Sequence, residues 1–416
     1  MRTVWRSIVQ STHAGQFVRV VVFSCCLVGT ARAAEEPSPA VTVRGFGTLG
    51  AVRASSGAAE FVRDLSQPKG ARASRWSWRT DSILGIQINA PVASDVEAVG
   101  QVVSRYRYDA TYRPEVMWGF LKWDLRPELS LRGGRLGTDF FMLADSRLVG
   151  YSNLPVRPPT DYFGILPFSY IDGGDALVTW PVGGGLLRGK AFAGYTREKV
   201  PLAERQWDLD GSLMRGGHLD FQRGAWTVRA GYARIRFDQD LPIADLQATL
   251  RSFPFPAFAR AADTLTVKDK DSRFYSAGLV YDDGPLQLQL MFNRTRHDSI
   301  LFQNSRAAYV IAGYRLDSVT PYAGYAQSTS RPKSQSDILT GVAPLDATVA
   351  STLGDSHTHQ HTWSLGARWD LAANVDLKLQ LDAVRGEPAS IFLYRGEQPG
   401  WRGRTNIFSV VTDFVF

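Results

Sequence analysis

Residues 405–416 read Thr405-Asn406-Ile407-Phe408-Ser409-Val410-Val411-Thr412-Asp413-Phe414-Val415-Phe416. Successive side chains of a strand point to opposite faces, so Ser409 and Asp413 share one face and phenylalanines dominate the other. An apolar edge strand with no polar residue after it invites aggregation in a soluble domain. A closed membrane barrel avoids this problem because its last strand pairs with its first. The stretch therefore indicates the closing strand of a barrel.

Residues 1–33 have the pattern of a secretory signal peptide. Arg2, Arg6 and Arg19 precede an apolar run at 20–28, and Ala31-Arg32-Ala33 supplies an A-x-A cleavage site. The apolar run is short for a membrane span of about 20 residues, so an uncleaved anchor is the weaker alternative. We expect cleavage to leave one domain, residues 34–416, exported to the outer membrane of a Gram-negative bacterium.

This cleavage would change the charge and the cysteine content. The whole chain has 47 Lys and Arg against 40 Asp and Glu, a formal net charge of +7. Residues 1–33 contain four arginines and no acidic residue, so the mature charge falls to about +3 and gives no argument for nucleic-acid binding. Cys25 and Cys26 would also leave, and with them any disulfide, Cys-ligated metal or Cys nucleophile.

Sixteen segments with alternating apolar and polar side chains follow one another through the mature chain. In 375–383, valine, leucine and alanine alternate with Asp376, Lys378, Gln380 and Asp382. Unpaired ions in a dry core cost several kcal/mol, so we expect the charged face to line water and the apolar face to contact lipid. The expected strands lie near 41–53, 80–90, 96–109, 115–125, 129–137, 174–182, 186–196, 213–222, 225–238, 272–282, 286–297, 306–316, 319–329, 360–371, 375–386 and 405–416.

The connections between these segments alternate between short and long. The short ones carry Gly, Pro, Asp or Asn, the residues that favour tight turns, and lie near 91–95, 126–128, 183–185, 223–224, 283–285, 317–318 and 372–374. The long ones lie near 54–79, 138–173, 197–212, 239–271, 330–359 and 387–404. Short turns, long loops and an even strand count predict an all-β fold, a 16-stranded antiparallel transmembrane β-barrel with short periplasmic turns and long extracellular loops. An immunoglobulin-like sandwich or a propeller does not predict this alternation.

Aromatic residues recur near the ends of the expected strands, as in the interfacial girdles of membrane barrels. They are Tyr108, Trp118, Trp180, Tyr195, Trp226, Tyr281 and Trp369. The connection after the fifth expected strand, near 138–173, contains Thr138-Asp139-Phe140-Phe141-Met142-Leu143-Ala144-Asp145-Ser146, which is unusually apolar for an exposed loop. Because sixteen strands enclose an aqueous channel, we expect this third loop to fold back inside and narrow it.

Three patches resemble the general porins of Gram-negative bacteria. Arg132-Gly133-Gly134-Arg135-Leu136-Gly137-Thr138 resembles their junction between strand and constriction loop, residues 41–50 resemble their first strand, and Phe416 resembles their last-strand signal. The resemblance implies passive diffusion of small hydrophilic solutes without a cofactor, a homotrimer in outer-membrane lipid, and reading of Phe414 and Phe416 by the barrel assembly machinery. The Pro-Glu-Phe-Gly-Gly loop motif of the enteric members is absent, so the resemblance does not extend to their cation-selective constriction.

The alternation also assigns cations to the inner wall. They are Arg44, Arg105, Arg107, Lys122, Arg132, Arg188, Lys190, Arg229 and Arg368, with Arg135 as a further candidate. In the resembled family such cations face acids of the third loop, and the matching acids here are Asp139, Asp145 and Asp161. The wall acids that can be assigned are fewer (Glu97, Asp124, Asp220, Asp370, Asp376 and Asp382), so we expect a weak preference for anions. The alternative for each cation is that it braces the loop or a neighbouring strand.

Two other kinds of site are less well supported. His357, His359 and His361 alternate so that three imidazoles could bind zinc or copper, but their face matches the lipid side and a solvated rim is the better interpretation. The remaining mature histidines, His218 and His297, lack the spacing of a hydrolase motif, so we expect no enzyme. The main alternative function is a substrate-specific channel or receptor with a binding ladder in the pore. About seven residues would precede the first strand, which argues against a plug domain.

Overall fold

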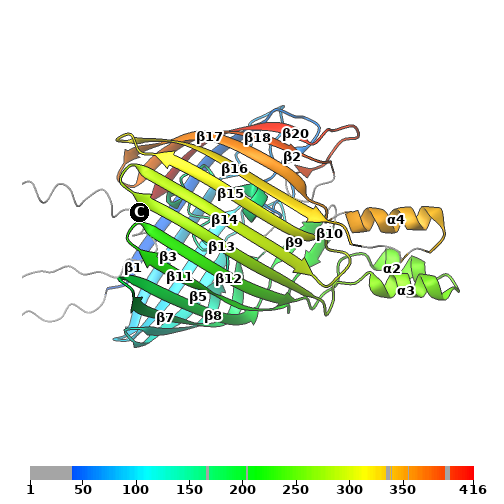
Figure 1. Ribbon diagram of the computed structural model, residues 1–416, viewed down its shortest axis with the longest axis horizontal. Coiled ribbons are helices and arrows are strands. Elements are labelled where there is room, and N and C mark those ends of the chain that lie inside the picture. Colours follow the sequence, from blue (N-terminus) through cyan, green and yellow to red (C-terminus); the bar gives the residue numbers. More distant parts are fainter. Residues whose placement is uncertain are drawn as a thin grey trace, which may run out of the picture.

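The computed structural model describes residues 40–164, 168–202, 205–333, 338, 340–354, 356–388 and 394–416. The expected signal peptide, 1–33, lies outside these residues. Sixteen antiparallel strands form a closed barrel (Figure 1). They are β1 (Thr42–Ala54), β3 (Ile83–Ala93), β4 (Val96–Arg105), β5 (Glu115–Arg126), β6 (Leu129–Gly137), β7 (Tyr170–Val182), β8 (Gly185–Tyr195), β11 (Leu213–Arg223), β12 (Trp226–Arg236), β13 (Asp271–Asp283), β14 (Leu286–His297), β15 (Asn304–Tyr314), β16 (Val319–Arg331), β17 (His359–Ala372), β18 (Val375–Gly386) and β20 (Arg404–Val415).

Each predicted strand range overlaps one of these strands, and the ends differ by up to four residues. Each barrel strand pairs with its neighbour in the chain, and β20 pairs with β1 to close the barrel. The 16-stranded barrel predicted from the alternation is therefore confirmed, with residues 405–416 in its closing strand.

The seam between β1 and β20 is covered on the outside by two phenylalanine rings. Gly47 lies opposite Phe414 in the register, and Gly45 exchanges backbone hydrogen bonds with Phe416. The ring of Phe414 lies over Gly47 and the ring of Phe416 over Gly45, so a Cβ at either glycine would collide with the ring. Aromatic rings often cover a glycine of the neighbouring strand in this way, and here they fill the outer face of the closing seam.

The two faces of the wall differ as the sequence predicts. In β18, Leu379 and Leu381 are exposed on the outside, whereas Lys378, Gln380 and Asp382 are buried inside. In β20, Phe408 is exposed and Ser409 is buried, and Phe416 directly after the strand is exposed. The outer surface of the wall is thus apolar and the inner surface carries ionised groups.

The two ends of the barrel are unlike each other. At one end, called the turn end, short connections join the strands at 94–95, 127–128, 183–184, 224–225, 284–285, 315–318 and 373–374. At the other, the loop end, the connections carry β2 (Glu60–Phe61), η1 (Gly150–Ser152), α1 (Thr160–Phe163), β9 (Lys199–Leu202), β10 (Arg205–Asp208), α2 (Ala244–Arg251), α3 (Pro256–Thr264), α4 (Ala343–Gly354) and β19 (Tyr394–Arg395). Helices α2, α3 and α4 project beyond the loop end, and the C-terminus lies at the turn end (Figure 1). Among the described residues, no helix is long and apolar enough to cross a membrane.

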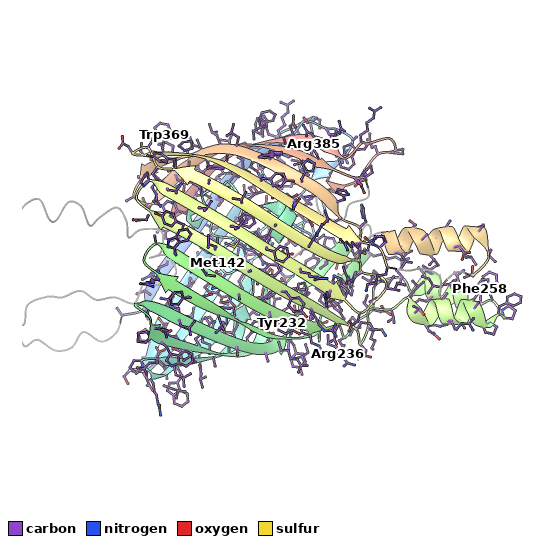
Figure 2. The ribbon with its side chains drawn as sticks, viewed as in Figure 1. Met142, Tyr232, Arg236, Phe258, Trp369 and Arg385 are labelled. Carbon is purple, nitrogen blue, oxygen red and sulfur yellow. The ribbon has the colours of Figure 1, made fainter. Side chains whose placement is uncertain are left out.

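Exposed aromatic side chains mark both ends of the apolar surface. Trp180, Trp226 and Trp369 are exposed at the turn end, where Figure 2 labels Trp369. The ring of Tyr281 lies 4.6 Å from that of Trp226, and Tyr195 is exposed toward the loop end. These positions agree with the predicted girdles.

Two of the aromatic residues expected in the girdles lie elsewhere. Trp118 is opposite the buried Gln101 and therefore faces the inside of the barrel. A bulge between Gln101 and Val102 changes the register there, which the local alternation did not reveal. Tyr108 lies in the connection between β4 and β5, outside the barrel strands.

Candidate functional site: the lumen and its infolded loop

The third loop, called loop 3 below, spans residues 138–169, and its described residues, 138–164 and 168–169, fold into the barrel. Its aromatic side chains pack on the inner wall, with the ring of Phe140 5.4 Å from that of Phe274 and the ring of Tyr162 5.1 Å from that of Tyr309. Phe140, Tyr162 and the nearby Met142 belong to one buried cluster with wall residues of β8 and β11–β16. The expectation of an infolded third loop is therefore confirmed, and burial of these apolar side chains explains why the segment leaves the solvent.

Small residues in the wall make room for loop 3. A Cβ at Gly278 would lie 2.7 Å from the sulfur of Met142, and one at Gly231 would collide with the carbonyl oxygen of Phe140. The hydroxyl of Ser276 donates a hydrogen bond of 2.7 Å to that same carbonyl oxygen. The loop thus lies directly on the backbone of β12 and β13.

The base of loop 3 is held by an ionic network on β8, β11 and β12. The ammonium of Lys190 lies 2.7 Å from Asp139, and His218 Nε2 lies 3.4 Å from the same carboxylate. Arg229 donates to the backbone oxygen of Asp139 at 2.9 Å and pairs with Asp220. Burial alone would raise the pKa of Asp139, but Lys190, His218 and Arg229 together outweigh it and hold that pKa well below its usual range.

The middle of loop 3 rests on β17 and β18. Lys378 donates to the backbone oxygens of Gly150 and Asn153, at 2.8 and 2.6 Å. Arg368 donates to the backbone oxygen of Tyr151 at 2.7 Å and pairs with Asp376 at 3.1 Å. Both cations are almost completely buried and brace the loop. For Arg368 this is the alternative role given above for the wall cations.

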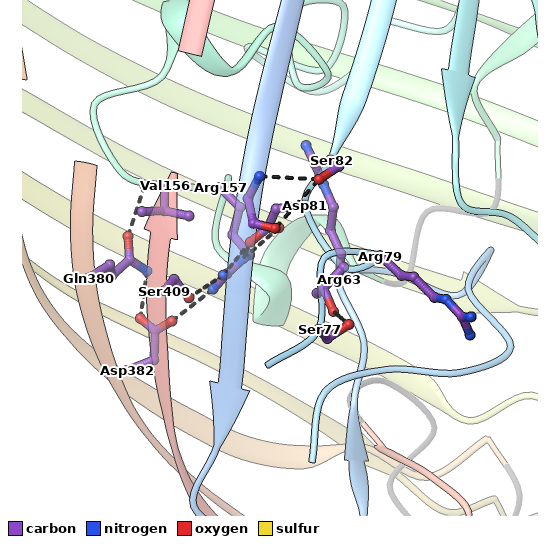
Figure 3. A network of polar contacts seen from close by, with 12 residues as sticks. Arg63, Ser77, Arg79, Asp81, Ser82, Val156, Arg157, Gln380, Asp382 and Ser409 are labelled. Atoms are coloured by element: carbon purple, nitrogen blue, oxygen red, sulfur yellow. Dashed lines mark hydrogen bonds and ion pairs between the residues drawn. The ribbon is translucent and has the colours of Figure 1, made fainter. Parts of the chain in front are cut away.

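A third anchor is the guanidinium of Arg157, which connects loop 3 to loop 1 (residues 55–82) and to the wall (Figure 3). Its Nη2 lies 2.6 Å from Asp81 of loop 1 and 2.5 Å from Ser409 of β20, and its Nη1 lies 3.0 Å from Asp382 of β18. Burial opposes the charge, but Asp81 and Asp382 outweigh burial and raise the pKa of Arg157. We call this set of contacts the Arg157 clamp.

Neither Arg157 nor Asp81 was among the predicted site residues. The available signal was an arginine within an apolar loop, next to Pro158 and Pro159; the other cation of the loop is Arg147. A charge that enters the barrel with such a loop must find a counter-ion there, although the sequence does not tell which one.

Several predicted wall cations are neutralised by neighbours on the wall or in loop 1. Arg132 makes a two-pronged contact with Asp175 at 2.9 and 2.6 Å. Lys122 lies 2.9 Å from Asp124, and Arg105 lies 3.6 Å from Asp64 of loop 1. These pairs reduce the net positive charge that the sequence alone assigned to the lumen.

Arg44, Arg188 and Asp145 are placed differently from these pairs. Arg44 occupies an inner-face position near the turn end and is exposed. Arg188 shares the inner face of β8 with Lys190, is half-buried, and has no hydrogen bond or ion pair within the described part of the chain. Asp145 of loop 3 is half-buried and accepts a hydrogen bond from the backbone of Ser146 at 2.9 Å. Arg188 is thus the wall cation with the most freedom to act on a passing ion.

Two of the predicted wall cations are not on the inner wall. Arg135 lies opposite Asp172 on the outer face and contacts it through two hydrogen bonds, of 2.7 and 2.9 Å. The prediction was wrong because Arg132 and Arg135 are three residues apart and therefore point to opposite sides of β6. Arg107 lies beyond the end of β4, where it pairs with Glu115 at 2.7 Å.

The prediction that Asp161 faces the channel was also wrong. Asp161 belongs to α1, is 0% exposed and lies beside Thr362 and Gln360 of β17. Burial raises the pKa of Asp161 to about 6. A short helix at this point turns the side chain away from the lumen, which a strand-like alternation could not anticipate.

The three closely spaced histidines lie at the loop end. His357 Nε2 and His359 Nδ1 approach the carboxylate of Glu387, at 2.7 and 3.0 Å, and His361 lies on the outer face with its ring 6.2 Å from that of Tyr325. Within the described residues, no group of three or more His, Cys, Asp or Glu side chains has an arrangement that could hold a metal ion.

Comparison with known proteins bears on the fold. No family model matches the sequence, and no curated protein sequence matches it. The chain is similar to the anion-selective porin from Comamonas acidovorans, with 13% identity, a TM-score of 0.53 and coverage of 91% of this chain and 99% of that one. It is also similar to OmpF of Salmonella typhi in complex with daunomycin and to the outer membrane channel DcaP of Acinetobacter baumannii, each with 12% identity, a TM-score of 0.51 and coverage of 90% and 97%. The protein has the 16-stranded fold of the outer-membrane porins.

Proposed function

We propose that the protein is a porin of a Gram-negative outer membrane, through which small hydrophilic solutes diffuse passively without a cofactor. The observation that carries the proposal is a closed barrel with an apolar outer face, an ionised inner wall and an infolded third loop. Water inside the barrel accounts for the charges on the inner face, and lipid outside accounts for the leucines. In this proposal residues 1–33 direct export and residues 34–416 form the barrel.

The proposal assigns no catalytic role to the histidines. Ser272 Oγ lies 2.6 Å from His297 Nδ1, which is the spacing of a nucleophile and its base. Ser272 is only 1% exposed, so a substrate carbonyl has no approach to it. His218 lies between Asp139 and Asp220, 3.4 Å from each, and its position suits bracing of loop 3.

We further propose a weak preference for anions, and Arg188 is the residue that supports it. Most predicted wall cations have acidic partners, so a strong preference is not expected. An unpaired guanidinium on the wall of a narrow aqueous path attracts anions. The contribution of one such group is modest because salt screens it.

A homotrimer and recognition by the barrel assembly machinery complete the proposal. The outer faces of β3–β7 carry small residues that would let a second wall approach closely, among them Gly100, Gly119, Gly133 and Gly174. Phe414 and Phe416 would be the residues read during assembly. Deletion of Phe416 should reduce the amount of assembled barrel in the membrane and leave the conductance of assembled channels unchanged.

The test is conductance and reversal potential in planar bilayers of neutral lipid. Wild-type protein should form open channels with a small excess of anion current, and Arg188→Glu should shift the reversal potential toward cation selectivity. The matched control is Arg223→Glu, which reverses an exposed charge at the end of β11, and it should have no effect. Absence of conductance would refute the channel, whereas cation preference in the wild type would refute only the anion preference.

A second candidate, a substrate-specific channel, is favoured by one feature of the inner wall. Gln101 donates to Gln87 at 3.0 Å, Gln87 donates to Asn89 at 2.8 Å, and Asn89 donates to Glu97 at 2.9 Å. Such a ladder of amides could exchange hydrogen bonds with neutral polar solutes. Liposome swelling with sugars, amino acids and organic acids of equal size would separate the two functions, because a general porin responds to size alone.

A further inference from the structure

Six arginines lie together on the outer face of β11–β15, near the loop end. Each lies directly opposite another arginine in the register of neighbouring strands, in the pairs Arg215 and Arg234, Arg234 and Arg273, Arg273 and Arg296, and Arg294 and Arg306. Their outward direction follows from the alternation, because Tyr232, Tyr275 and Phe292 share their faces and are exposed. We call these six residues the arginine belt.

The arginine belt carries more positive charge than its acidic neighbours neutralise. Arg234 pairs with Asp271, and Arg273 pairs with Asp298 at 2.8 Å and lies 3.8 Å from Asp271. Arg306 donates to the hydroxyl of Thr329 at 3.2 Å. The other three residues have no ion pair in the part of the chain that the structure describes, namely Arg215, Arg294 and Arg296. Like charges directly opposite each other destabilise a sheet, so this arrangement calls for an external anion.

The side chains below the arginine belt place it at a definite depth. Tyr232 and Tyr275 lie opposite each other, with ring centroids 5.3 Å apart, on the side of the belt that faces the middle of the barrel. Beyond them the outer face becomes apolar, with exposed Val228, Leu290 and Phe292. Figure 2 labels Tyr232 and, closer to the loop end on the same strand, Arg236. Because tyrosine prefers the membrane–water boundary, the belt lies at the level of lipid phosphates.

The same height on the other side of the barrel carries no such excess. On β3–β5, Leu84 lies opposite Ser104 and Val102 lies opposite Val116. On the neighbouring β6, Arg135 is matched by Asp172 of β7. One further pair of outward arginines, Arg385 and Arg404, lies at the loop end of β18 and β20. The positive surface is therefore not uniform around the loop end, and its largest continuous part is on β11–β15.

We propose that the arginine belt binds the phosphate groups of lipids in the membrane leaflet at the loop end. This inference rests on the proposed outer-membrane location, where that leaflet carries lipopolysaccharide, a phosphorylated glycolipid. A guanidinium forms two parallel hydrogen bonds with a phosphate. Cross-strand neighbours lie about 5 Å apart, so one headgroup phosphate can contact two arginines and remove their mutual repulsion.

The experiment measures the thermal unfolding of the purified full-length protein in a neutral detergent. Lipopolysaccharide, enzymatically dephosphorylated lipopolysaccharide and inorganic phosphate at equal phosphate concentration are the three additions. Wild-type protein should melt at least about 3 °C higher with lipopolysaccharide and unchanged with the other two. The variant Arg215→Gln/Arg294→Gln/Arg296→Gln should lose most of this shift.

The matched control is Arg126→Gln/Arg223→Gln/Arg260→Gln, which removes three exposed arginines at the turn end and on α3 and should keep the full shift. An equal shift in the belt variant, or in wild type with the dephosphorylated glycolipid or inorganic phosphate, would overturn the proposal. Native mass spectrometry of lipopolysaccharide retained by each variant gives a second readout that does not depend on stability. Conductance in neutral bilayers is recorded on the same preparations, so failure of the channel and failure of lipid binding are distinguishable.

Discussion

The outer faces of β3–β7 and of β11–β15 belong to one barrel wall, but they differ in the size and the charge of their side chains. The first carries Gly100, Gly119, Gly133 and Gly174, and its charged residue Arg135 is matched by Asp172. The first also exposes Leu84, Ile86 and Leu121 around this group of glycines, whereas the second carries bulky apolar residues below the arginine belt and no such group of glycines. Bulky apolar side chains interact favourably with lipid tails, and arginines interact favourably with the phosphates of lipid headgroups. A second protein wall, in contrast, packs best against small residues. The difference therefore suggests that one side faces a subunit and the other faces lipid.

The largest effect is expected from a bulky side chain on the β3–β7 side. A Cβ at Gly133 would meet no atom within 4 Å in the isolated barrel, so Gly133→Trp should fold and yet dissociate the proposed trimer completely. The control Ala230→Trp, on the exposed outer face of β12, should leave the trimer intact. Native mass spectrometry reports the oligomeric state. Trimers that survive Gly133→Trp would contradict the assignment of this side to a subunit.

A change inside the barrel should leave both outer faces unaffected and still alter stability. Burial raises the pKa of Asp161 to about 6, so the folded protein holds this proton more tightly than the unfolded chain does. The contribution of protonated Asp161 to the free energy of unfolding is then fully present below about pH 4 and is lost as the pH rises through about 6. Between pH 4 and pH 7, wild type should lose roughly 2–3 kcal/mol relative to Asp161→Asn.

Urea unfolding at a series of pH values measures this difference, with Asp145→Asn as the control for removal of a carboxylate from loop 3. The curve for Asp145→Asn should follow the wild type. If Asp161→Asn altered the oligomeric state or the response to lipopolysaccharide, the two outer faces would not be independent of loop 3.

The next effect is a contrast of sign between the two faces. Arg135→Gln removes a two-pronged contact from Asp172 and should destabilise the barrel by about 1 kcal/mol or less, because the pair is partly exposed. Arg294→Gln removes a like-charge neighbour of Arg306 and should stabilise the barrel by a similar or smaller amount in neutral detergent. Urea unfolding without lipid gives the change in the free energy of unfolding for both variants. Changes of the same sign would contradict the proposed difference in charge between the two outer faces.

The smallest expected effect is that of salt. Screening shortens the range of charge interactions from about 10 Å at 0.1 M to about 3 Å at 1 M, so added salt should relieve repulsion within the arginine belt. The melting temperature of the lipid-free wild type should rise by about 1 °C. The Arg215→Gln/Arg294→Gln/Arg296→Gln variant should show no rise, and an equal rise in both proteins would mean that salt acts elsewhere.

The strands could be predicted because each depends on a local pattern. Leu379 and Leu381 alternate with Lys378 and Gln380 within a few residues, and the environment on each side of the wall follows directly from that alternation. The infolded loop could be predicted for a similar reason, since the run from Phe140 to Met142 is too apolar for solvent.

The contacts inside the lumen could be predicted less well because they depend on where distant segments meet. Arg157 contacts Asp81 and Asp382, which are far from it in the sequence, and nothing local to any of them specifies the others. Arg135 was misplaced by one step of the alternation and Asp161 by a short helix. The arginine belt required the register of five strands, because each strand alone shows only one or two outward arginines.

The seam between β1 and β20 has a consequence for how the protein reaches its folded state. The two strands are separated by nearly the whole described sequence, so their pairing is among the most distant contacts in the chain and should form slowly. Until Phe414 and Phe416 reach Gly47 and Gly45, β1 keeps an unpaired edge. A chain interrupted anywhere before β20 would keep two such edges. Closure of the seam is therefore possible only for a chain that contains every strand of the barrel.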